Sequence, residues 1–442
     1  MESKLLKGTF FLIAIILFFV TSNINWGKDD WKGALESDAK GYYAYLPAIF
    51  IYQDLNFSFL EEVEKKYDQK HIYWDYRAEV YGVSINKYYS GVALLQSPFF
   101  LLAHSVSYLT NNDLDGYSKW YMLSISISSI FYHLIGLWFL VRLLLLYQVK
   151  ERIIAACLVL LSFASNLYVY TIVEAGMSHV YSFALISMFL YYAKKYTEGH
   201  KPIDLIRISI LLGIILICRP INGLIVLFIP FLHVNSNALI ATLKHYFGSL
   251  KNILTSVTLL ISVVSIQLVI YKISTGHFLI YSYDQEGFDF SNPQFFNILF
   301  SYKKGLFLYT PLFFIASLSA VHLLRKSAYH FFSWVLFFLM ITYVFSSWWV
   351  WYFGGSFSSR VYVDYLPVFI LPLALYLNQL KQVWKKRSIM VLLAMITVVC
   401  QIQSYQYRYY EIHYSEMTKD KYWEVFLLRN RFNPPKLGER KE

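Results

Sequence analysis

Repeated apolar runs, most of them close to the length of a membrane-spanning helix, constrain this 442-residue chain more than any other feature. A helix needs about 20 consecutive apolar residues to cross a bilayer. The chain is also 57% hydrophobic and only 15% charged, which is too apolar for a soluble globular protein. We therefore predict an all-α polytopic membrane protein. The runs lie at residues 8–25, 91–110, 117–146, 153–170, 178–194, 206–234, 253–272, 306–323, 330–347, 361–378 and 388–404.

The lysines and arginines between these runs predict how the chain crosses the membrane, because short cytoplasmic loops carry an excess of both residues. All basic connectors fall on one side if 91–110 is an interfacial helix and if 206–234 is two short helices broken at Arg219 and Pro220. This arrangement gives about eleven transmembrane helices, with the N-terminus in the cytoplasm and the C-terminus outside. The net charge of +11 then reflects topology, and no nucleic-acid partner is predicted. The basic connectors are Lys4/Lys7, Lys150/Arg152, Lys194/Lys195/Lys201/Arg207, Lys244/Lys251, Arg325/Lys326 and Lys381/Lys385/Lys386/Arg387.

The same topology divides the chain into a transmembrane domain, residues 1–404, and an external C-terminal tail, residues 405–442. The domain contains a long first external loop, 26–116, which carries the interfacial helix. The first apolar run has no small-residue cleavage site directly after it, so we expect an uncleaved helix. The three cysteines have neither paired nor metal-binding spacing, and no nucleotide-binding or common hydrolase motif is present.

The stretch ESDAKGYYAYLPAIF, residues 36–50, contains the first candidate for chemistry, Asp38. We expect its aromatic side chains, Tyr42 and Tyr43 among them, to lie along the membrane surface and to hold Asp38 near the bilayer. A partly desolvated carboxylate there suits the acceptance of a proton from a hydroxyl group. The competing acids are Asp29 and Asp30, which the flanking lysines favour as a solvated charged turn.

Glu174 and His179 lie in a short external turn, where either side chain suits a contact with a cation or a sugar hydroxyl. On a continuous helix the two residues would be about 140° apart, so a joint metal site would require a non-helical turn. For His179 the simpler interpretation is a hydrogen-bonded interfacial histidine. Trp351, in the aromatic loop 346–360, suits stacking on a sugar face or anchoring at the interface.

Four cations predicted outside are exceptions to the positive-inside pattern: Arg219, Lys303, Lys304 and Arg360. A lipid phosphate at the outer interface would be held by such groups, since arginine offers a planar fork to phosphate oxygens and lysine a point charge. The alternatives are that the lysines reach toward the interface along their apolar stems, and that Arg360 pairs with Asp364 at helical i, i+4 spacing.

The layout resembles the GT-C superfamily of integral-membrane glycosyltransferases, which includes protein O-mannosyltransferases, aminoarabinose transferases of lipid A and oligosaccharyltransferases. The resemblance rests on one helix, a long external loop carrying an acid, and many later spans with short loops. The RPIN turn at 219–222 and the GGSFSSR stretch at 354–360 are similar to patterns in bacterial members. The resemblance implies that Asp38 is the catalytic acid of the first loop, that 91–110 is an interfacial helix, and that Glu174 is the acid of the second loop.

The chain departs from that pattern at the acid itself. Many members have two adjacent acids in the first loop, whereas Asp38 lies between Ser37 and Ala39, and the adjacent pair is Asp29 and Asp30. The choice of base therefore stays open between them. In the superfamily a metal requirement goes with diphosphate-linked donors, so no metal ligands are predicted here, although a divalent cation stays open as a cofactor.

These observations lead to one expected function and three alternatives. The expected function is transfer of a sugar from a polyprenyl-phosphate donor to a hydroxyl of a glycan, lipid or protein, at the outer face of the bacterial cytoplasmic membrane. Asp38 would take the proton, the cations would stabilise the leaving phosphate, and the anomeric configuration would invert. A flippase or transporter would instead place ionisable residues along the membrane midplane. The remaining alternatives are a polysaccharide polymerase or ligase and a scaffold.

Overall fold

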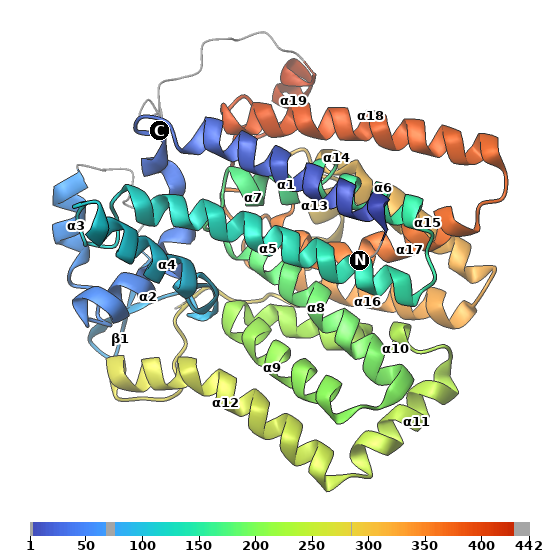
Figure 1. Ribbon diagram of the computed structural model, residues 1–442, viewed down its shortest axis with the longest axis horizontal. Coiled ribbons are helices and arrows are strands. Elements are labelled where there is room, and N and C mark those ends of the chain that lie inside the picture. The colour runs from blue at the N-terminus through green and yellow to red at the C-terminus, as the bar shows by residue number, and fades with distance from the viewer. Residues whose placement is uncertain (1–2, 68–75, 284, 428–442) are drawn as a thin grey trace.

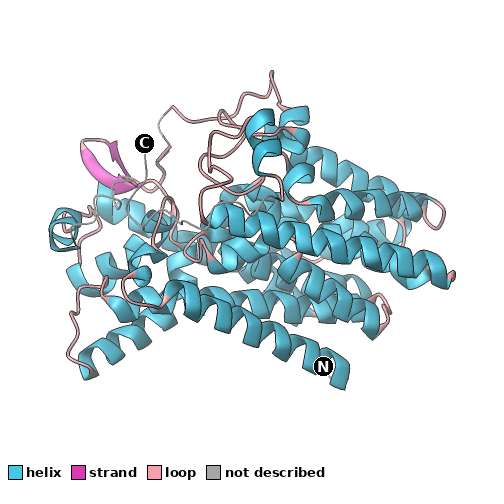
Figure 2. Ribbon diagram, turned by 90° about the horizontal axis from the view of Figure 1, so that it is seen from above, coloured by secondary structure: helices cyan, strands magenta, loops and turns pink. Residues whose placement is uncertain are grey.

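The computed structural model describes residues 3–67, 76–283 and 285–427. Helices make up most of this part of the chain (Figure 1), as the apolar runs predict. The described residues contain one small antiparallel sheet, formed by β1 (Arg77–Val80) and β2 (Val83–Asn86), at one end of the helical bundle (Figure 2). The predicted class, an all-α multi-pass membrane protein, agrees with this architecture.

Among the described residues, seven helical segments are long and apolar enough to cross a membrane. An eighth results if the bent pair formed by 220–232 and α11 (Ser236–Phe247) is one span, with an angle of 120° between its two parts. The segment 220–232 consists of the 3-10 helix η4 (Pro220–Phe228) and α10 (Ile229–Leu232). The seven are α1 (Lys4–Asn25), α4 (Gly91–Leu109), α5 (Lys119–Leu146), α12 (Leu250–Thr275), α16 (Ala328–Ser346), the 3-10 helix η5 (Arg360–Tyr365) joined to α17 (Leu366–Gln379), and α18 (Val383–Arg408).

Several predicted spans are shorter helices in the structure. The runs at 153–170 and 306–323 form α6 (Glu151–Phe163) and α15 (Pro311–Leu324), which have 13 and 14 residues. The first part of 206–234, predicted as a short helix, forms α9 (Pro202–Cys218), which has 17 residues. Each is shorter than the ~20 residues that a full crossing requires. The helix lengths therefore establish a polytopic protein without establishing eleven crossings.

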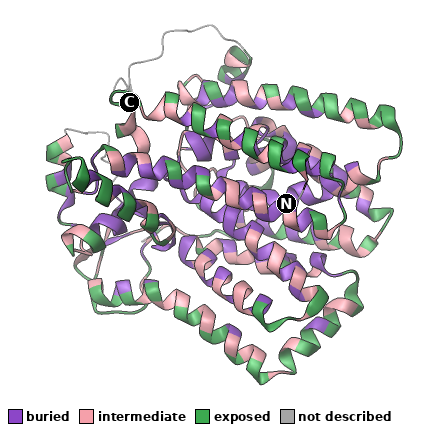
Figure 3. Cartoon of the chain, in the orientation of Figure 1, coloured by how far each residue is buried: buried purple, intermediate pink, exposed green. Residues whose placement is uncertain are grey.

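The core lies where α8 (Ser178–Gly199) packs between α5 and α9. Gly136 on α5 allows this close approach, because a Cβ atom there would lie 2.3 Å from the ring of Phe183 on α8. By contrast α1, α12 and α18 cover the bundle and carry many exposed apolar side chains, such as Phe11, Ile261 and Val398 (Figure 3). Such surfaces suit contact with lipid acyl chains.

The predicted break at Arg219 is present. The backbone of Arg219 is extended, with φ −154° and ψ 105°, and α9 ends at the preceding residue, Cys218. Pro220, which follows, disfavours a helical conformation at Arg219. Arg219 is therefore the first residue after α9.

The segment 36–50 differs from the prediction. It forms α2 (Ala39–Pro47), in which all nine residues are buried, followed by the π-helical turn η2 (Ala48–Tyr52). The tyrosines therefore pack inside the protein instead of lying along the membrane surface. The remaining described helices of the first loop are η1 (Asp30–Ala34), a 3-10 helix, and α3 (Leu60–Tyr67).

The segment 91–110, predicted as an interfacial helix, forms α4 and packs antiparallel to the first half of α5. Tyr132 on α5 donates to the carbonyl of Leu95 over 3.0 Å, and His104 Nδ1 lies 2.6 Å from the Tyr121 hydroxyl. With 19 residues α4 is also one of the seven segments that meet the length for a crossing. Residues 68–75 of the predicted loop lie outside the described residues.

The described part of the predicted C-terminal tail folds back onto the bundle. Residues 405–408 complete α18, and the short helix α19 (Lys419–Val425) places the ring of Tyr422 5.4 Å from that of Tyr309, on α14 (Leu306–Tyr309). Residues 428–442 lie outside the description. Two further short helices are α7 (Leu167–Ile172) and α13 (Phe295–Phe300).

Candidate functional site

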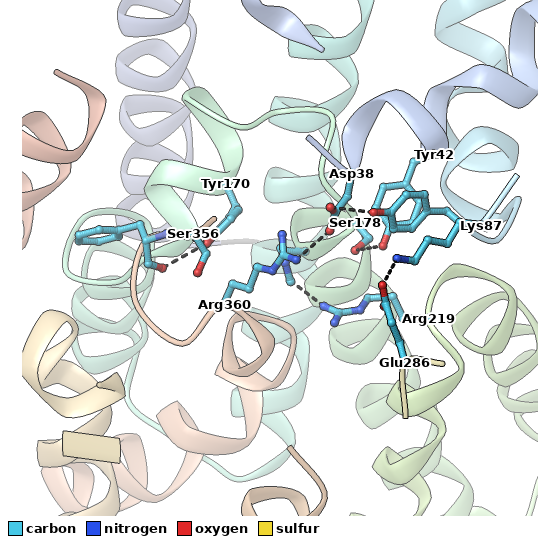
Figure 4. A network of polar contacts seen from close by, with 12 residues as sticks. Asp38, Tyr42, Lys87, Tyr170, Ser178, Arg219, Glu286, Ser356 and Arg360 are labelled. Carbon is cyan, nitrogen blue, oxygen red and sulfur yellow. Dashed lines mark hydrogen bonds and ion pairs between the residues drawn. The ribbon is translucent and has the colours of Figure 1, made fainter. Parts of the chain in front are cut away.

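The starts of α2 and η5 meet at a buried ion pair between Asp38 and Arg360 (Figure 4). Asp38 directly precedes α2, and Arg360 begins η5. Arg360 Nη2 lies 2.8 Å from Asp38 Oδ2, and the Tyr88 hydroxyl donates to Asp38 Oδ1 over 2.8 Å. Both oxygens of the carboxylate are thus held, in a place where the side chains of Asp38 and Arg360 are only 15% and 11% exposed.

The charge state of Asp38 follows from these contacts. Burial by itself would raise the pKa of Asp38, but Arg360 and the hydrogen bond from Tyr88 lower it, and Arg219 and His179 add smaller effects in the same direction. The net result is a pKa below the usual 3.8. Asp38 is therefore a carboxylate at neutral pH.

The guanidinium group of Arg360 is only partly satisfied. Its Nε and Nη1 atoms are buried and find no hydrogen-bond acceptor among the residues that the structure describes. A buried donor without a partner costs about 1–3 kcal/mol, and more when it is charged. The two free nitrogens therefore mark a place where an anion would bind favourably.

A second buried carboxylate, Asp364, lies beside the first pair and is fully buried. His179 Nδ1 lies 2.7 Å from Asp364 Oδ1, and Asn222 donates to Oδ2 over 2.7 Å. Arg219 Nη1 contacts the same Oδ2 at 3.2 Å and lies 3.0 Å from His179 Nδ1. A neutral His179 with its proton on Nδ1 donates to Asp364, and in that tautomer Nδ1 does not accept from Arg219.

The predicted alternative that Arg360 pairs with Asp364 is wrong. Both residues lie in η5, a 3-10 helix with about three residues per turn, so side chains four apart are about 120° apart around its axis. Arg360 therefore reaches Asp38, and Asp364 reaches Arg219 and His179.

The two predicted tyrosines have different surroundings. The Tyr42 hydroxyl accepts from Ser178 over 3.3 Å, and its ring packs on Tyr88 at a centroid distance of 4.9 Å. Tyr42 thus lines the Asp38 site. Tyr43 donates instead to the carbonyl of Gly116, and its side chain fixes the first loop.

Glu174 and Lys304 lie in a separate polar cluster. Glu174 accepts from Tyr407 over 2.5 Å. Lys304, 1% exposed, donates to the carbonyls of Ser356 and Tyr414 and to the Ser356 hydroxyl. Burial, and then the charge of Arg360, lower the pKa of Lys304 well below its usual value. Lys304 therefore joins the C-terminal segment to the loop before η5, and its hydrogen atoms are already engaged.

Lys303 and Trp351 lie on the turn that contains Tyr352. The ammonium nitrogen of Lys303 is 3.6 Å from the centroid of the Tyr352 ring, and Trp351 packs against the same ring at 5.5 Å. Neither has a described contact with Asp38 or Arg360. Of the four predicted cations, only Arg219 and Arg360 belong to the two buried carboxylate clusters.

The competing acid Asp29 belongs to an exposed turn. Its side chain is 80% exposed and pairs with Lys32 at 3.1 Å, as a solvated surface pair would. Within the described ranges, no group of three or more His, Cys, Asp or Glu side chains is placed to hold a metal ion.

A segment after α12 covers the Asp38 site. Lys87 forms an ion pair with Glu286, and Ser282 donates to the Lys87 carbonyl over 2.8 Å (Figure 4). The ring of Tyr283 meets the edge of Tyr88 at 6.4 Å. Residue 284 lies outside the description. Lys87, which precedes Tyr88, thus holds this covering segment in place.

Three residues of the site were not singled out from the sequence as functional: Tyr88, Asn222 and Asp364. Asn222 belongs to the RPIN turn, so this sequence pattern could have identified it as a residue of the site. Asp364 was considered only as a partner of Arg360. Tyr88 is one of many tyrosines in the chain, and nothing local distinguishes it.

Comparison with known proteins gives no relative: no family model, no curated protein and no solved structure matches the chain.

We predict that Glu174→Gln changes how stability depends on pH. Burial raises the pKa of Glu174 to about 7, although Tyr407 and Arg360 act against the rise. An acid with a raised pKa binds more protons when folded, so wild-type stability should fall as pH rises from about 4.5 to 7, by about 3 kcal/mol. Thermal unfolding in detergent from pH 4.5 to 8 should show this fall in the wild type and a flatter curve in Glu174→Gln. Parallel curves would show that Glu174 does not titrate in this range.

Proposed function

We propose that the protein is a membrane glycosyltransferase, similar to the GT-C superfamily, that transfers a sugar from a polyprenyl-phosphate donor to an acceptor hydroxyl. The observation that carries the proposal is the buried Asp38–Arg360 pair, in which an acid suited to act as a base contacts a guanidinium group with two unpartnered nitrogens. One cluster thus offers both groups that such a transfer needs, a base for the acceptor hydroxyl and a cation for the leaving phosphate.

The anion that best fits Arg360 is a phosphate. Arginine binds phosphate oxygens through two parallel N–H bonds, and fixed positive charge stabilises the negative charge that develops on a leaving phosphate. Arg219, held by Asp364, adds a second cation beside the pair. The surrounding helices are apolar, which suits a phosphate attached to a lipid.

The reaction would proceed as a single displacement. The acceptor oxygen attacks the anomeric carbon, the bond from that carbon to the phosphate oxygen breaks, and its electron pair leaves with the lipid phosphate. The acceptor proton would pass to Asp38, which is ionised. Attack opposite the leaving group inverts the anomeric configuration. Tyr42, Tyr88 and Ser178 would contact the sugar or the acceptor.

The position of the site along the helices supports the outer face. His179 lies in the first turn of α8, whereas Lys194 and Lys195 lie toward its other end. Arg219 follows α9, whereas Arg207 lies near its start. Because basic connectors favour the cytoplasm, the Asp38 site would face outward, in the outer leaflet of a bacterial cytoplasmic membrane. The acceptor would be a glycan, lipid or protein on that side.

The proposal is tested in cells that lack the protein. Mass spectrometry of their lipid extract and envelope should show that one polyprenyl-linked sugar accumulates and that the same sugar is missing from the envelope. The wild-type gene should reverse both changes, and Arg360→Gln at equal membrane abundance should not. An unchanged lipid and envelope profile in the deleted cells would reject the transferase assignment.

A further inference from the structure

We propose that Asp38 and the phosphate of the donor compete for the same edge of the Arg360 guanidinium group. Binding of the donor would then release Asp38 from Arg360 and allow it to act as the base. The inference rests on the proposed function and adds an order of events to it: the donor binds first, the Asp38–Arg360 pair opens, and only then can the acceptor be deprotonated.

The first support is that neither oxygen of Asp38 is free of a donor in this structure. Tyr88 holds Oδ1 and Arg360 holds Oδ2, each at 2.8 Å. An acceptor hydroxyl must donate its proton to one of these oxygens. As long as Arg360 neutralises the carboxylate at contact distance, proton transfer to it is disfavoured. The pair is therefore a resting state of the base.

The second support is that only one of the three guanidinium nitrogens of Arg360 contacts Asp38. Arg360 gives only Nη2 to Asp38, while Nε and Nη1 are buried and have no partner among the described residues. A phosphate that binds the Nη1–Nη2 edge with two bonds uses the nitrogen that Asp38 holds. The phosphate and the carboxylate also repel each other, so both cannot occupy this edge at close range.

The third support is that Asp38 has an anchor that does not depend on Arg360. The Tyr88 hydroxyl bonds the other oxygen, and Tyr88 itself packs on Tyr42 and Tyr283. When Arg360 turns to the phosphate, Tyr88 would keep the carboxylate in place with Oδ2 released toward the acceptor. The exchange therefore needs a change of partner and no large movement of α2.

The experiment measures the affinity of purified full-length protein in nanodiscs for a polyprenyl phosphate without sugar. If Asp38 competes with phosphate for Arg360, its neutral replacement Asp38→Asn should bind the lipid about tenfold more tightly than the wild type. Asp38→Ser removes the same charge and should behave alike, which covers a failure of Asp38→Asn to fold. Asp29→Asn is the matched control: it removes an acid from the same loop, one that is 80% exposed and pairs with Lys32, and its affinity should stay within twofold of wild type.

Two results separate the inference from the proposed function. If folded Asp38→Asn and Asp38→Ser bind the polyprenyl phosphate no more tightly than wild type, the exchange is wrong. The proposed function would stay intact in that case if wild-type protein binds the polyprenyl phosphate and not the matching polyprenol. If wild-type protein and Arg360→Gln each bind the polyprenyl phosphate no more tightly than the polyprenol, Arg360 does not form a phosphate site. That result would reject the exchange as well.

Discussion

Asp38→Asn is expected to slow sugar transfer by about 10²–10⁴-fold, the range that a positioned general base contributes. Asparagine has nearly the shape of aspartate and its carbonyl oxygen can still accept from Tyr88, but its amide nitrogen neither accepts from Arg360 nor takes the acceptor's proton. The measurement is the rate at which the missing sugar returns to the envelope when expression is induced in the deleted cells, at matched membrane abundance. This rate should be lost although the lipid phosphate binds more tightly.

The control for that result is Asp29→Asn, which removes an acid from the same loop. Because the Asp29 side chain is 80% exposed and pairs only with Lys32 in the surface turn, its replacement should leave the rate within about twofold of wild type. A fast Asp38→Asn together with a slow Asp29→Asn would transfer the role of base to the exposed acid.

Asp364→Ala is expected to cause the largest loss of stability, about 3–5 kcal/mol. The change removes the carboxylate that His179, Asn222 and Arg219 share, and it leaves the Arg219 charge without its partner in the bundle. Breaking a buried pair by removing one partner is costly because the other charge stays desolvated. Unfolding by denaturant in detergent measures the effect.

A matched control for Asp364→Ala is Glu286→Gln, which breaks the Lys87 pair. That pair is more exposed, with the Glu286 side chain 27% accessible, so its loss should cost less than about 1 kcal/mol. If Asp364→Ala were no more destabilising than Glu286→Gln, the buried cluster would not stabilise the ends of α8, α9 and η5.

The sequence predicted the class of fold and several of the residues that meet at the site. Apolar runs are local and long, so helices and their membrane character follow directly from them. The break at Arg219 was also predictable, because Pro220 follows it. Asp38, Arg219 and Arg360 were singled out as charges beside apolar runs, and the structure places Arg360 against Asp38.

What the sequence could not predict is which charge contacts which. Asp38 and Arg360 are far apart in the chain, so their pairing depends on tertiary packing. Asp364 was expected at an α-helical spacing from Arg360, but the local 3-10 geometry turned the two side chains apart. Lys304 was predicted to hold a lipid phosphate or to reach toward the interface, but its side-chain nitrogen is buried against backbone carbonyls.

The central claim, that the protein moves a sugar off a lipid phosphate, is tested most directly with the purified protein. The lipid-linked sugar that accumulates in the deleted cells would be supplied to wild-type protein in nanodiscs together with the envelope acceptor fraction. The account predicts release of free polyprenyl phosphate, with the sugar joined to the acceptor in the opposite anomeric configuration and both products absent with Asp38→Asn. Intact lipid-linked sugar after incubation with folded wild-type protein, or its movement across the bilayer without cleavage, would contradict it.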